Sequence, residues 1–225
     1  MGEFLAIYAD KIDDWLPRLL FAAGATLRLT MITFVVACII GLVFALLRTS
    51  KNRLIRRIAV VYIEVVRGLP ALVILFLLYF GLGDLGISWL TMNTFTAAVI
   101  GLGMQGGALL AEVFRSGIEA LHRGQTEAAL SIGMTPTQAT VYIILPQALR
   151  IVLPPVANYL VGLLKETSIC SIIATPELML RAKDLASASF RPMHVFLLAG
   201  VLYFVMSYPL SLAVRYLEAK LAKDR

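Results

Sequence analysis

Charged residues are scarce in this sequence of 225 residues, in which Asp, Glu, Lys and Arg together make up only 15%. Hydrophobic residues make up 60%, whereas a soluble domain has about a quarter charged residues and is nearer half apolar. This shortage of charge excludes an ordinary soluble domain. It indicates a chain whose solvent is mostly a lipid bilayer.

Two further shortages exclude classes of chemistry. Cys38 and Cys170 are the only cysteines, both in apolar surroundings and without metal-ligand spacing, and we interpret them as small buried hydrophobic residues. The sequence contains no Gly-x-x-x-x-Gly-Lys-Ser/Thr motif to cradle nucleotide phosphates, and no set of nucleophile and base. We therefore expect no enzyme activity and no cofactor or metal site in this chain.

Long apolar runs dominate what is present. A helix needs about 20 residues to cross the hydrocarbon core, and lipid leaves no other way to satisfy the backbone of a single span. The sequence predicts an all-α membrane protein whose residues 1–225 form one transmembrane domain. Its five expected spans are residues 22–47, 58–80, 94–114, 149–164 and 195–214.

The basic residues mark alternate connections between these spans, which accounts for the net charge of +6 without nucleic acid. They follow the first, third and fifth spans, whereas the connection after the second span has none. The positive-inside rule then predicts an N-terminus outside and a C-terminus inside. The connection after the fourth span fits less well, because it holds Lys165, Arg181, Lys183 and Arg191. We expect it to be outside or partly buried.

A capped pattern occupies the connection between the third and fourth spans. Thr126 is a suitable cap for a short helix that starts at Glu127, and Gly133 is suited to end it in a left-handed conformation. Thr135 then precedes Pro136, with Gln138 three residues on, which predicts a capping box and a second helix. The pattern predicts a rigid helix over 126–134 on the cytoplasmic side.

This segment carries a family resemblance. Glu127-Ala128-Ala129, Gly133 and Ile143-x-Leu145-Pro146 match the EAA motif of bacterial ABC importer permeases, and residues 64–70, 111–118 and 164–168 resemble the polar amino acid subfamily. The resemblance implies a type I importer permease fold with five spans in the bacterial cytoplasmic membrane. It also implies a second permease subunit, identical or paralogous, two ATPase subunits that bind ATP and magnesium, and an extracytoplasmic solute-binding protein.

In that family the helix that starts at the EAA residues couples the permease to the ATPase. The resemblance therefore assigns coupling to Glu127, Ala128, Ala129 and Gly133. It leaves open whether the solute is histidine, arginine, glutamine, glutamate, cystine or an opine. A carrier acting alone is a competing interpretation, but it would need internal symmetry that the sequence does not show. A membrane scaffold would give no reason for the motif.

Two pairs of opposite charges lie near the cytoplasmic ends of spans. Glu64 and Arg67 share a helix face, as do Glu112 and Arg115. Mutual ion pairing near a cytoplasmic gate is one interpretation. A direct role in solute binding is the other.

The fourth span ends in Lys165-Glu166-Thr167-Ser168, eleven steps or about 17 Å beyond Pro154. Ionisable groups at such depth are costly and commonly functional, so we expect these four residues to face the solute. Pairing of Lys165 with Glu166 at a subunit interface is the equally weighted alternative. Gln105 and Asn158 are further candidates for the solute path, against tight helix packing near Gln105 and a bond between helices at Asn158.

Overall fold

The structure, a computed structural model, describes residues 2–84, 91–120 and 123–223, and these residues form helices and turns with no strand. The helical elements, in order, are α1 (Gly2–Arg48), α2 (Arg53–Gly68), α3 (Ala71–Phe76), η1 (Leu77–Gly81), α4 (Leu82–Asp84), α5 (Thr94–Glu119), α6 (Arg123–Ser131), α7 (Pro136–Gln138), η3 (Ala139–Ile144), α8 (Leu145–Glu166), η4 (Thr167–Ile173), α9 (Leu178–Ser189) and α10 (Pro192–Lys223).

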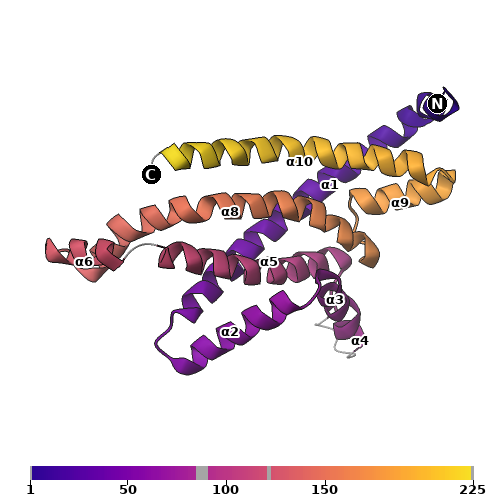
Figure 1. The fold of residues 1–225 in the computed structure, drawn as a ribbon. Helices are drawn as coiled ribbons and strands as arrows, with labels where there is room; N and C mark the ends of the chain where they lie inside the picture. The colour runs from indigo at the N-terminus through magenta and orange to yellow at the C-terminus, as the bar shows by residue number, and fades with distance from the viewer. Residues whose placement is uncertain (1, 85–90, 121–122, 224–225) are drawn as a thin grey trace.

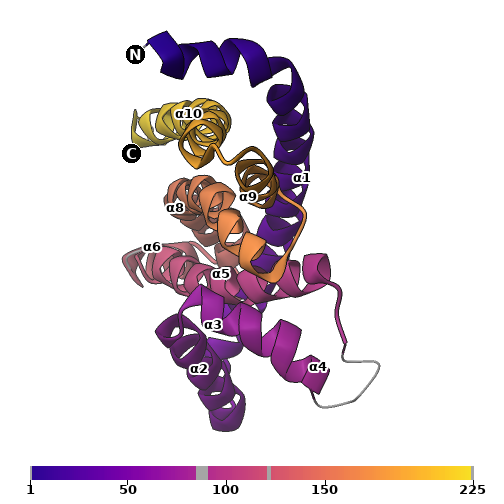
Figure 2. The ribbon, with the colours of Figure 1, turned by 90° about the vertical axis from the view of Figure 1, so that its right-hand side faces the viewer.

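The long helices lie side by side. Figures 1 and 2 show α5, α8 and α10 stacked roughly parallel or antiparallel, with α1 crossing along one flank of the stack. The helix pair α1 and α5 forms the most extensive contact. α6 projects at one end of the stack and α9 lies at the other, so the two ends differ in structure.

Four helical segments of the described chain are long and apolar enough to span a membrane: residues 7–48, 94–117, 136–173 and 192–221. The remaining expected span, the second in the chain (58–80), is not one straight helix. The structure divides this region between α2 and the helical segment 71–84, which meet at an angle of 107°. The prediction of an all-α membrane protein is confirmed. The expected second span corresponds to a bent pair of helices, which is long and apolar enough to span a membrane when the two helices are taken together.

The chemistry of proline explains the break. Pro70 disfavours a helical conformation in the residue before it, and Leu69 is indeed extended, with φ −98° and ψ 140°. Pro70 is extended as well, with ψ 141°, and α3 starts directly after it. The hydropathy of the region predicts its length in the membrane but not this bend.

α1 is much longer than the expected span of 22–47. Its 47 residues correspond to about 70 Å of helix, more than twice the thickness of the hydrocarbon core. Trp15 and Leu19, before the expected start, are buried in a cluster with residues of α9 and α10. Figure 2 shows the first part of α1 bent over the stack, and Pro17 is the proline within this helix.

Small residues allow α5 to approach its neighbours closely. A Cβ atom added at Gly107 would overlap Ile40 of α1, and one added at Gly106 would overlap the hydroxyl of Tyr159 of α8. These glycines therefore serve tight helix packing, as is usual between helices in membranes.

We expect Gly107→Ala to destabilise the fold by about 1–3 kcal/mol, because the new methyl group overpacks the contact between α1 and α5. The matched control is Gly24→Ala, where a Cβ meets nothing within 4 Å and helix propensity makes alanine slightly stabilising. Thermal unfolding in detergent measures both variants. Equal melting temperatures would contradict the packing role of Gly107.

Candidate coupling segment and solute site

α6 ends as the sequence predicts. Gly133 has φ +86°, and its amide donates to the Leu130 carbonyl while the Met134 amide donates to the Ala129 carbonyl, at 3.0 and 3.1 Å. These two bonds form a Schellman motif, which satisfies the last carbonyl groups of the helix and requires a left-handed residue at Gly133. The chain turns sharply there, and a Cβ at Gly133 would meet no atom of this chain.

The start of α6 differs from the prediction. The helix begins at Arg123 rather than at Glu127, so Thr126 lies inside the helix and is not its cap. Within the motif, Glu127 and Ala128 are exposed, whereas Ala129 is buried. α6 packs against η3, where Ala139 is fully buried. Ala129 therefore lies on the side of α6 that is anchored to the chain, and Glu127 and Ala128 lie on the free side.

The second predicted cap is confirmed. The Thr135 hydroxyl accepts from the Gln138 amide at 3.3 Å, and the Gln138 side chain accepts from the Thr135 amide at 2.9 Å. Helix then continues from Pro136 through the π-helical turn η3 into α8. Pro146 lies at the start of α8, directly after the π-helical turn, and it does not interrupt the helical segment.

An ion-pair network joins α1 and α5 near the ends from which the two basic connections leave. Arg115 donates to Glu112 at 2.8 Å and also pairs with Glu119, while Arg48 at the end of α1 pairs with Glu112 from the other side. The predicted Glu112–Arg115 pair is confirmed. The sequence analysis missed Arg48, because a contact between α1 and α5 leaves no local signal. It also missed Glu119, although a spacing of four residues from Arg115 on one helix is such a signal.

Glu64 and Arg67, the other pair of opposite charges expected on one helix face, differ from Glu112 and Arg115. Both side chains are exposed on α2, and in the part of the chain that the structure describes no ion pair involves either of them. The predicted pairing within this subunit is therefore absent, although helical spacing does place the two residues on one face.

The cluster 165–168 lies where α8 passes into η4. Lys165 is exposed and Glu166 and Ser168 are partly exposed, but Thr167 is fully buried and its hydroxyl donates to the Leu164 carbonyl at 2.8 Å. Ser168 donates to the Lys165 carbonyl at 2.7 Å. No ion pair joins Lys165 to Glu166 among the residues described. Lys165 and Glu166 are thus the charged groups available to a solute or a partner.

The two remaining candidates lie in different surroundings. Gln105 of α5 is partly buried, and its Oε1 atom is buried without a hydrogen-bond partner. Asn158 of α8 is exposed and donates to Glu218 of α10 at 2.6 Å, which is the bond between helices considered above. Gln105 therefore retains an unused acceptor, whereas the Asn158 amide is engaged by α10.

A buried polar junction was missed at the opposite end of the molecule from α6. Glu177 is 1% exposed, caps α9 by accepting from the amides of Met179 and Leu180 at 2.8 and 2.6 Å, and accepts from the Tyr203 hydroxyl of α10 at 2.8 Å. Thr26 of α1 accepts from the Leu178 amide at 2.9 Å. Glutamate is not a favoured N-cap, so no sequence signal marked this residue.

The pKa of the Glu177 carboxyl is raised above its usual value, because the effect of burial outweighs that of these donors. Burial raises the pKa of the Glu177 carboxyl, while the amides of Met179 and Leu180, the Tyr203 hydroxyl and the nearby Lys183 ammonium act to lower it. Lys183 itself donates to Ser171 of η4 at 2.8 Å. The connection after α8 is thus partly buried, as expected. Glu177 and Lys183 are engaged within the fold, whereas Arg181 and Arg191 are exposed.

No group of three or more His, Cys, Asp or Glu residues that could hold a metal ion occurs within residues 2–84, 91–120 and 123–223.

Comparison with known proteins agrees with this geometry. The family model "Binding-protein-dependent transport system inner membrane component" matches residues 37–223. The probable amino-acid ABC transporter permease protein YckA of Bacillus subtilis (strain 168) is 38% identical, over 92% of this chain and 90% of that protein. The probable glutamine ABC transporter permease protein GlnM of the same strain is 35% identical, over 88% of this chain and 91% of that protein.

A solved structure is similar over nearly the whole fold. The crystal structure of an amino acid ABC transporter with histidines contains a chain that is 35% identical, with a TM-score of 0.88 over 93% of this chain and 97% of that one. This likeness confirms the type I importer permease fold. The chain therefore belongs to the family of inner membrane components of binding-protein-dependent transport systems, which are ABC transporter permeases and not enzymes.

Proposed function

We propose that this chain carries a polar amino acid across the cytoplasmic membrane as one of two permease subunits. Two ATPase subunits that bind ATP and magnesium drive it, and an extracytoplasmic solute-binding protein supplies the solute. The observation that carries this proposal is α6, a capped helix with one anchored face and one exposed face at the end of the stack (Figure 1). When a partner protein displaces such a helix, the displacement is passed on to η3 and α8.

The proposed orientation places α6 and the C-terminus inside and the N-terminus outside. It rests on the arginines around the turn between α1 and α2 and near the ends of α5 and α10, which the positive-inside rule assigns to the cytoplasm. α9 and the Glu177 junction then lie on the outer side.

The proposed solute site lies at the end of α8. Lys165 and Glu166 carry opposite charges that no residue of the described chain neutralises by an ion pair, and the ammonium and carboxylate of an amino acid are complementary to them. Ser168 and the unused Gln105 Oε1 offer further hydrogen bonds. Thr167 supports the end of the helix from its buried position.

We expect Gly133→Ala to reduce uptake and solute-stimulated ATP hydrolysis severely while it lowers the melting temperature of the isolated chain by only a few degrees. The left-handed conformation costs alanine about 1–2 kcal/mol, which loosens the end of α6, but the new methyl group meets no atom of this chain. Gly124→Ala is the matched control, on the same helix and also without a neighbour within 4 Å. Normal uptake by Gly133→Ala would contradict the coupling role.

The two alanines of the motif provide a second test. Ala128→Leu is expected to keep the melting temperature and to lose co-purifying ATPase, because Ala128 lies on the free face of α6. Ala129→Leu is expected to lower the melting temperature, because the larger side chain cannot fit against η3. If both variants retained the ATPase and its activity, this face would not be the docking face.

We expect Glu166→Gln to raise the KM for uptake by roughly tenfold to a hundredfold, which corresponds to the loss of a hydrogen bond to a charged group. The amount of co-purifying ATPase should not change. Asp184→Asn, an exposed carboxylate on α9, is the control for loss of one negative charge. An unchanged KM for Glu166→Gln would remove Glu166 from the solute site.

A further inference from the structure

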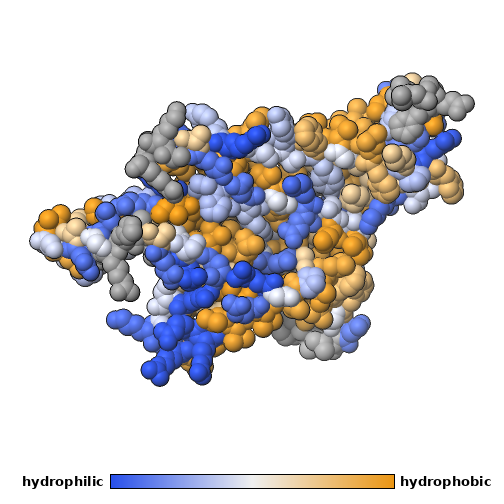
Figure 3. Space-filling view, viewed as in Figure 1, coloured by the Kyte–Doolittle hydropathy of each residue, from blue (hydrophilic) through white to orange (hydrophobic). Residues whose placement is uncertain are grey.

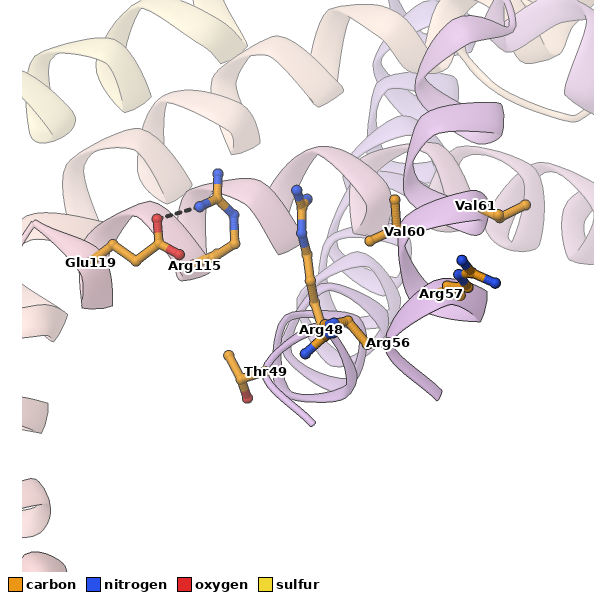
Figure 4. A pocket seen from close by; sticks show the side chains of 8 residues that line it. All are labelled: Arg48, Thr49, Arg56, Arg57, Val60, Val61, Arg115 and Glu119. Atoms are coloured by element: carbon orange, nitrogen blue, oxygen red, sulfur yellow. Dashed lines mark hydrogen bonds and ion pairs between the residues drawn. The ribbon is translucent and has the colours of Figure 1, made fainter. Parts of the chain in front are cut away.

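A basic pocket lies between the end of α1, the first half of α2 and the last turns of α5. It has a volume of about 610 Å³, and Figure 4 shows the side chains around it. Its lining residues are Arg48, Thr49, Arg56, Arg57, Val60, Val61, Arg115 and Glu119. Four arginines therefore line one cavity, with one glutamate among its walls.

The four arginines are not equally neutralised. Arg48 and Arg115 pair with Glu112. Arg115 also pairs with Glu119, as the dashed line in Figure 4 marks. Arg56 and Arg57 on α2 are exposed, and no ion pair to either is found in the described residues. The pocket thus has two arginines held in position by carboxylates and two whose charge is available to an anion.

An apolar stripe runs along α2 beside the pocket, from Leu54 before the two arginines to Val65 beyond them. Leu54, Ile58, Val61 and Val65 are spaced by four, three and four residues, so they form one stripe, and each is more than half exposed. The stripe is about 16 Å long, close to the depth of the acyl chains in one leaflet. Figure 3 shows the hydrophilic end of α2 bordering a hydrophobic surface.

We propose that this pocket binds the phosphate of an anionic phospholipid, whose acyl chain lies along the stripe of α2. Guanidinium groups bind phosphate oxygens through paired hydrogen bonds, and basic pockets between membrane helices on the cytoplasmic side are suited to lipid headgroups. Arg56 and Arg57 meet the phosphate, while Arg48 and Arg115 shape the wall behind it. This site is separate from α6 and from the end of α8, so it lies outside the proposed coupling and solute sites.

The apolar stripe favours a lipid over an acidic partner protein. An acidic segment would satisfy the arginines but would leave Leu54, Ile58 and Val61 without a complement. A phospholipid complements both the charge and the stripe with one molecule. The assignment to the cytoplasmic leaflet rests on the orientation proposed above, whereas phosphate binding by the pocket does not.

The test is a titration of the purified full-length chain in mixed micelles with dioleoylphosphatidylglycerol or dioleoylphosphatidylcholine, with bound lipid counted by native mass spectrometry. We expect the anionic lipid to bind preferentially. The double variant Arg56→Gln/Arg57→Gln should lower its affinity by about tenfold or more, at roughly 1 kcal/mol per basic residue. Arg56→Lys/Arg57→Lys should retain most of the binding, because it keeps both charges.

The matched control is Arg150→Gln/Arg215→Gln, which removes two exposed charges outside the pocket and should leave binding unchanged. Equal loss in both double glutamine variants would overturn the proposal, as would equal affinity for the two lipids. Displacement of the lipid by an equal concentration of inorganic phosphate would show that the pocket binds a free anion. Loss of co-purifying ATPase with unchanged lipid binding would assign Arg56 and Arg57 to a protein contact instead.

Discussion

Every backbone amide and carbonyl of this chain that lies in lipid must find its partner inside the protein, and the rest of the structure depends on this constraint. It explains why the described residues are helical and why the chain departs from regular α-helix only at particular places. At Leu69–Pro70 the proline disfavours a helical conformation in the residue before it, and the helix breaks there. At η3 and η4 the chain changes to π and 3₁₀ turns, which still satisfy the backbone internally. Irregularity is therefore confined to segments that keep their hydrogen bonds.

Once the helices form, lipid gives little reason for one to prefer another helix over a lipid tail, so close packing and buried polar bonds must supply the association. α1 and α5 meet over Gly103 and Gly107, where any larger side chain would overlap Val36 or Ile40. At one end of the stack Arg48 and Glu112 link the same two helices. At the other end Glu177 links α9 to α10. The glycines thus set the distance between α1 and α5, and the polar junctions hold the ends of the stack.

The sequence predicted the features whose causes are local. The left-handed Gly133, the capping box of Thr135 with Gln138 and the Glu112–Arg115 pair each depend on residues within five positions of one another. The sequence did not predict features that depend on contacts between residues far apart in the chain. The extra length of α1 comes from burial of Trp15 against α9 and α10, and the same holds for the Arg48–Glu112 and Glu177–Tyr203 contacts. Helical spacing placed Glu64 and Arg67 on one face, but spacing does not determine whether two exposed side chains pair.

The geometry also explains how a helix at one end of the stack can act on charges near the other end. α6 packs against η3 through its anchored face, and η3 continues without a break through α8 into η4, so residues 136–173 form one helical segment of about 57 Å. Lys165 and Glu166 lie near its far end. The segment is not uniformly stiff, because the π-helical turn at 139–144 and the prolines at 154 and 155 weaken its backbone bonding. A displacement of α6 would therefore reach the charged cluster as a bend concentrated at these two places. Lys165 and Glu166, which we propose face the solute, would then turn relative to α5 instead of sliding past it.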